Sequence, residues 1–78
     1  MKLKDLPPPK ENGTHVRLQL KNEPAIWRLG ILFSPYKMPP GVYGVKGRWR
    51  VPFLPDGLEK SKTTSFSIRS IEKCEVIE

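Results

Sequence analysis

The chain has 78 residues, a length typical of one domain with a thin hydrophobic core. Its 14 lysine and arginine residues outnumber its 8 aspartate and glutamate residues, and the net charge of +6 fits either an anionic partner or a solvated basic face. The single cysteine excludes a disulfide within the chain, and the apolar runs are too short for a transmembrane helix.

The first 13 residues are predicted to form an extended, proline-rich arm. Three successive prolines, Pro7 to Pro9, fix the backbone φ angle and remove hydrogen-bond donors, which favours a polyproline-like conformation. We therefore expect two parts, an arm over residues 1–13 and a globular domain over residues 14–78.

Two segments with alternating apolar residues follow the arm. In HVRLQLK, residues 15–21, the side chains of Val16, Leu18 and Leu20 share one face, as in a half-buried strand. The residues KNEP, 21–24, are predicted to form a loop. In WRLGILF, residues 27–33, we expect the face that contains Trp27 and Phe33 to be the core face.

The middle of the chain combines a proline-rich loop with a basic strand. SPYKMPPG, residues 34–41, is typical of a loop. Residues 45–54 are predicted to form a strand with Trp49 in the core. One face carries Val45, Gly47, Trp49, Val51 and Phe53, and the other carries Lys46, Arg48, Arg50, Pro52 and Leu54. The glycines at 44 and 47 are explained by bends or bulges in that strand.

The last third of the chain is predicted to contain two further strands. Pro55-Asp56-Gly57 is a turn signature, and residues 58–62 continue as a polar loop. Residues 63–68 and 73–77 are predicted strands, separated by a short turn over residues 70–72. Five short strands without a helical pattern indicate an all-β fold, either a small barrel or a tight sandwich.

This pattern resembles the five-stranded SH3-like small barrel of KOW, Tudor and related modules. The resemblance covers residues 14–78. It rests on Trp27 and Gly30 in the second strand and on the short turn before the last strand, where those modules have one turn of 3₁₀ helix. It implies a five-stranded barrel that works as a binding module, although one superfold hosts many functions.

The sequence shows no group of residues with the types and spacing of a catalytic or metal-binding site. His15 and Cys74 are single residues of their kinds, so no Cys/His metal site is expected within one chain. The acidic residues form no pair suited to general acid–base work. The glycines at 41, 44 and 47 lack the lysine and the helix of a phosphate-binding loop. We expect no enzyme activity, no cofactor, no metal and no small-molecule substrate.

The basic strand is the first candidate for a binding surface. Lys46, Arg48 and Arg50 alternate with the predicted core residues, which places them about 7 Å apart in a row on the outer face. No acidic residue occurs between Glu23 and Asp56, and Arg28 and Lys37 add charge to this region. These five basic residues predict contacts with nucleic acid phosphates.

Two alternatives to nucleic acid binding remain open. The chain could be a small subunit that docks on a larger protein through the loop that carries Tyr36, Met38 and Tyr43. It could also be a Tudor-like reader of methylated cations. The second alternative is weaker because Trp27 and Phe33 are predicted core residues, and no acid lies beside the tyrosines. Salt dependence separates phosphate binding from an apolar interface.

A cytoplasmic location is expected. Small secreted domains usually contain disulfides, whereas this chain has one cysteine. The basic start of the chain, MKLKDLPPPK, is not followed by the apolar stretch of a signal peptide.

Overall fold

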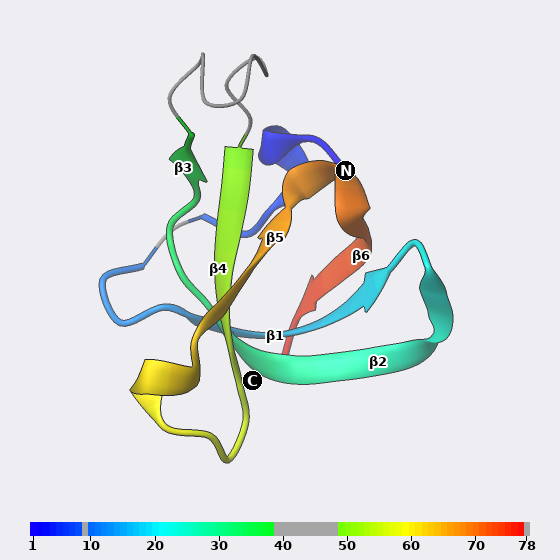
Figure 1. Cartoon of the computed structure of the whole chain (residues 1–78). Coiled ribbons are helices and arrows are strands. Elements are labelled where there is room, and N and C mark those ends of the chain that lie inside the picture. Colours follow the sequence, from blue (N-terminus) through cyan, green and yellow to red (C-terminus); the bar gives the residue numbers. More distant parts are fainter. Residues whose placement is uncertain (9, 39–48, 78) are drawn as a thin grey trace.

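The protein folds into a curled antiparallel β-sheet that forms a half-barrel (Figure 1). The computed structural model describes residues 1–8, 10–38 and 49–77. The strands are β1 (Thr14–Leu20), β2 (Glu23–Leu32), β3 (Tyr36–Lys37), β4 (Trp49–Pro55), β5 (Thr64–Ser67) and β6 (Ile71–Val76). Single 3₁₀ turns are η1 (Leu3–Asp5), η3 (Lys60–Lys62) and η4 (Ile68–Ser70). In the described part of the chain, no helix has the length and apolar character needed to cross a membrane.

The long strand β2 joins two parts of the curled sheet. It pairs with β1, and β1 pairs with β6 on its other side. The end of β2 also pairs with β4, which holds β5 along its other edge and the short β3 near its start. The strands therefore follow the order β6-β1-β2-β4-β5, and each described pairing is antiparallel.

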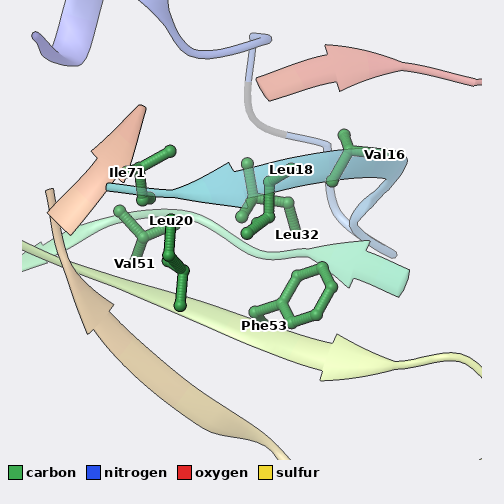
Figure 2. Packing of buried hydrophobic residues seen from close by; sticks show 7 residues of the cluster. All are labelled: Val16, Leu18, Leu20, Leu32, Val51, Phe53 and Ile71. Carbon is green, nitrogen blue, oxygen red and sulfur yellow. The ribbon is translucent and has the colours of Figure 1, made fainter. Parts of the chain in front are cut away.

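The core lies inside the curl, where side chains from β1, β2, β4 and β6 meet (Figure 2). The buried apolar residues are Val16, Leu18, Leu20, Leu32, Val51, Phe53 and Ile71. The alternation seen in β1 is confirmed, because its three apolar side chains are all buried. The ring of Phe66 on β5 packs against Phe53 with the ring centroids 6.0 Å apart.

The predicted core face of β2 is wrong. Gly30 and Leu32 are buried, whereas Leu29 is 48% exposed and Trp27 and Phe33 are only half-buried. A Cβ at Gly30 would lie 2.2 Å from the Leu54 carbonyl oxygen and 2.8 Å from the Phe53 ring. The core face of β2 thus includes a glycine, which allows β4 to approach closely, and an apolar pattern does not reveal such a face.

Several boundaries differ from those predicted. The segment predicted as a KNEP loop is shorter, because β2 begins at Glu23, and the predicted proline-rich loop contains β3. The 3₁₀ turn before the last strand is η4, two residues earlier than expected, so Ile71 begins β6 and reaches the core. The turn at residues 55–57 is confirmed, with Gly57 at φ 83°.

The N-terminal segment contacts the half-barrel. Met1 and Leu6 pack, partly buried, against the core, and η1 lies between them. The amino group of Met1 donates a hydrogen bond to the carbonyl oxygen of Ile71 over 3.3 Å. The boundary at residue 13 stays a prediction, but the start of the arm contributes apolar contacts to the domain.

Candidate nucleic-acid interface

The pairing of β3 with β4 forms a short ribbon that concentrates basic and aromatic side chains. Tyr36 lies opposite Arg50, and Lys37 lies opposite Trp49. Side chains of directly opposed residues in an antiparallel pair project from the same face. One face of the β3–β4 ribbon therefore carries Tyr36 with Arg50, and the other face carries Lys37 with Trp49. Each face combines one aromatic ring with one cation.

The large apolar side chains of the ribbon, and that of Met38 directly after β3, are exposed to solvent. The exposed fractions are 44% for Tyr36, 39% for Met38 and 36% for Trp49. The prediction that Trp49 belongs to the core is wrong, although Val51 and Phe53 on the same strand face are buried. Alternation within a strand places a side chain on a face, but burial also requires an opposing layer. The described core does not extend along β4 beyond Val51.

Arg50 is held in position by a neighbouring strand. Its Nη2 atom donates hydrogen bonds to the carbonyl oxygen of Ser65 at 3.0 Å and to the hydroxyl oxygen of Ser65 at 3.1 Å. A guanidinium group has five N–H donors, so these contacts orient the group and leave other donors for a ligand. Arg50 is thus a preorganised cation at the base of the ribbon.

The structure brings together residues from both predicted binding sets. Lys37 and Arg50 were predicted to contact nucleic acid, and Tyr36 and Met38 to form an interaction loop. Lys37, Arg50 and Tyr36 lie in the β3–β4 ribbon, and Met38 directly follows β3. The other members of these sets between β3 and β4 are Lys46, Arg48 and Tyr43, and they lie outside the described residues together with Gly41, Gly44 and Gly47.

Arg28 has a separate structural role. It lies on β2 opposite Leu18 of β1, whereas Arg50 lies on β4. The two arginines therefore do not belong to one row of charges along a strand. Its Nη2 atom lies 2.6 Å from the Glu23 carboxylate, and both side chains are partly buried. This ion pair balances the charge of Arg28, and its contribution to stability is small at such exposure.

Charges on the outer face of β1 are also paired. The Arg17 Nε atom donates to the Glu75 carboxylate over 2.7 Å, and His15 Nε2 lies 2.8 Å from Asp56 Oδ2. The guanidinium carbon of Arg17 lies 4.5 Å from the centroid of the Trp27 ring. Because Arg17 already covers a face of this ring, Trp27 is poorly suited to an aromatic cage for an external cation.

Cys74 is a half-buried residue that packs against the core. Burial, with a smaller contribution from the charge of Glu75, raises the pKa of its thiol from 9.0 to about 11. The thiol form is therefore favoured in the folded protein, and the nucleophilic thiolate is scarce at neutral pH.

We expect Cys74 to react slowly with a thiol reagent such as Ellman's reagent at pH 8. The pKa difference between 9.0 and about 11 lowers the thiolate fraction roughly 100-fold. In urea the rate should return to that of a free cysteine, and equal rates in native and unfolded protein would contradict the assignment. Because the thiol ionises in the unfolded chain near pH 9 but in the folded protein only near pH 11, unfolding releases a proton in this range. The free energy of unfolding is therefore unaffected below pH 9 and falls as the pH rises toward 11.

Sequence reasoning missed the exposed ring of Trp49, which adds a second aromatic side chain to the ribbon. No signal in the sequence separates Trp49 from Val51 and Phe53, which share its strand face and are buried in the described core. Comparisons with protein families, with curated proteins and with solved structures find no match for this chain.

Proposed function

We propose that this protein is a non-enzymatic module that binds single-stranded nucleic acid through the β3–β4 ribbon. The observation that carries the proposal is the pairing of one exposed ring with one cation on each ribbon face, Tyr36 with Arg50 and Trp49 with Lys37. Proteins that bind single strands without sequence preference combine aromatic stacking platforms with basic grooves.

The proposed scaffold is an SH3-like small barrel. The strand order β6-β1-β2-β4-β5 and the 3₁₀ turn η4 directly before β6 support this assignment. The scaffold places the ribbon at the start of β4, and β5 braces it through the hydrogen bonds between Arg50 and Ser65.

Binding divides into stacking and phosphate contacts. Unpaired bases stack on Tyr36 and Trp49, each worth about 1–3 kcal/mol in proteins of this kind. Lys37 and Arg50 contact phosphates, which carry no sequence information. The ribbon therefore favours single strands over duplexes, shows little sequence preference and binds less tightly as salt rises.

Replacement of both rings, Tyr36→Ala with Trp49→Ala, is expected to weaken binding of a labelled oligothymidylate by about 30-fold or more, because two stacking platforms are lost. Fluorescence anisotropy measures the affinity. The matched control is Ile26→Ala with Leu58→Ala, which removes two exposed apolar side chains outside the ribbon. Lys37→Gln should lower the slope of log K against log salt by about 0.7. Equal affinity of the double-ring variant and the control would refute the proposal.

A second candidate function is docking on a protein partner. Tyr36 and Trp49 in the ribbon and Met38 directly after β3 are each exposed, and aromatic residues and methionine are enriched at protein interfaces. Such docking would depend little on salt. If no oligonucleotide binds at low salt, this candidate takes precedence, and a pull-down with the ring variant as the negative control tests it.

A further inference from the structure

A groove of ≈ 500 Å³ lies between the turn that joins β1 to β2 and the 3₁₀ turn η4. Its walls are Leu20, Lys21, Asn22, Phe66, Arg69 and Ser70. The backbone N–H of Lys21 donates to the carbonyl oxygen of Ser70 over 2.9 Å, which connects the two walls. The groove is thus built from segments almost 50 residues apart in the chain.

The lining of the groove combines an apolar surface with two cations. Phe66 and Leu20 supply the apolar part, and Lys21 and Arg69 are exposed basic residues. Asn22 adds an amide that can both donate and accept hydrogen bonds. No acidic residue lines the groove within the described part of the chain. This chemistry suits a planar group attached to an anion, as in a nucleotide unit.

The groove is connected to the β3–β4 ribbon through β5. Arg50 lies opposite Ser67 in the pairing of β4 with β5. The hydroxyl oxygen of Ser67 accepts a hydrogen bond from the backbone N–H of Arg69 over 3.4 Å. Arg50 is therefore connected through Ser67 to Arg69, which lines the groove together with Lys21. The segments that carry these three cations, residues 49–55, 64–70 and 20–22, contain no acid.

We propose that this groove is a second subsite for the same single strand, and that it takes a nucleotide downstream or upstream of those held by the ribbon. This inference rests on the proposed function. The groove is connected to a ribbon that carries two exposed rings, which favours a nucleic acid strand as the occupant. An acidic peptide would also bind the cations, but it would gain less from the Phe66 ring than a base does.

The test compares oligothymidylates of about 4 and about 16 nucleotides, which span the site sizes of small single-strand-binding barrels. The groove variant is Lys21→Gln with Arg69→Gln. The matched control is Lys60→Gln with Lys62→Gln, which removes the same charge from the exposed turn η3. Circular dichroism checks that each variant is folded.

The groove variant is expected to bind the long oligonucleotide roughly tenfold more weakly than the control does, with a salt slope lower by about 1.4, since two phosphate contacts are lost. The short oligonucleotide occupies only the ribbon, so the groove variant and the control should bind it equally. Phe66→Leu keeps an apolar side chain but removes the ring, and should also weaken only the long complex.

Three results would overturn the inference, and they are distinguishable. If the groove variant matches the control on the long oligonucleotide while the ring variant of the ribbon is weak, the groove is not a subsite and the proposed function stands. If the ring variant binds both lengths like the wild type, the proposed function itself fails. If a polyglutamate peptide binds in a manner that depends on Lys21 and Arg69, and the oligonucleotides do not, the occupant is an acidic protein.

Discussion

Phe53→Ala is expected to destabilise the protein by about 3–5 kcal/mol, which is a large part of the stability of a small domain. The Phe53 side chain is 1% exposed and is the largest fully buried side chain among the described residues. It also contacts Phe66 and covers Gly30, so its loss opens a cavity between β2, β4 and β5. Urea denaturation followed by tryptophan fluorescence measures the change.

A matched control for this variant is Leu58→Ala. Leu58 is 52% exposed and lies in the loop after β4, so its truncation should change the free energy of unfolding by less than about 0.5 kcal/mol. If the urea midpoint of Phe53→Ala equalled that of the control, Phe53 would not be the centre of the core.

Gly30→Ala is expected to cost about 3 kcal/mol, although it adds only one methyl group. The added Cβ would meet the Leu54 carbonyl oxygen at 2.2 Å, and that oxygen belongs to the backbone of β4. Because a backbone atom cannot rotate away as a side chain can, the pairing of Gly30 with Pro55 has to open. Amide hydrogen exchange on β2 and β4, together with the melting temperature, measures the effect.

Two further variants separate this clash from other effects of alanine. Gly57→Ala introduces a side chain at φ 83° with no atom within 4 Å, and should cost about 1–2 kcal/mol from backbone strain alone. In Phe53→Ala with Gly30→Ala, the contact with the Leu54 oxygen remains, so no rescue is expected. Recovery of stability in the double variant would show that the Phe53 ring, and not the β4 backbone, excludes a side chain at Gly30.

Several features of the protein follow from short-range patterns and were predictable. Strict alternation predicts β1 because Val16, Leu18 and Leu20 have to share a face in any extended conformation. The turn at residues 55–57 follows from the ability of Gly57 to adopt a positive φ. Arg50 entered the candidate site through its charge and its alternation with predicted core residues, and Lys37 through its charge in an acid-free region. Both belong to the ribbon.

The sequence by itself determined the all-β class, the inner face of β1 and the basic excess, because these depend on residue type and on the two-residue repeat of a strand. Only the tertiary structure decided that Gly30 faces the core, that Trp49 lies at the surface and that Lys21 meets Ser70. Burial depends on whether another layer covers a face, and a groove depends on contacts between distant segments. Neither the burial of a strand face nor the presence of a groove can therefore be deduced from one stretch of the chain.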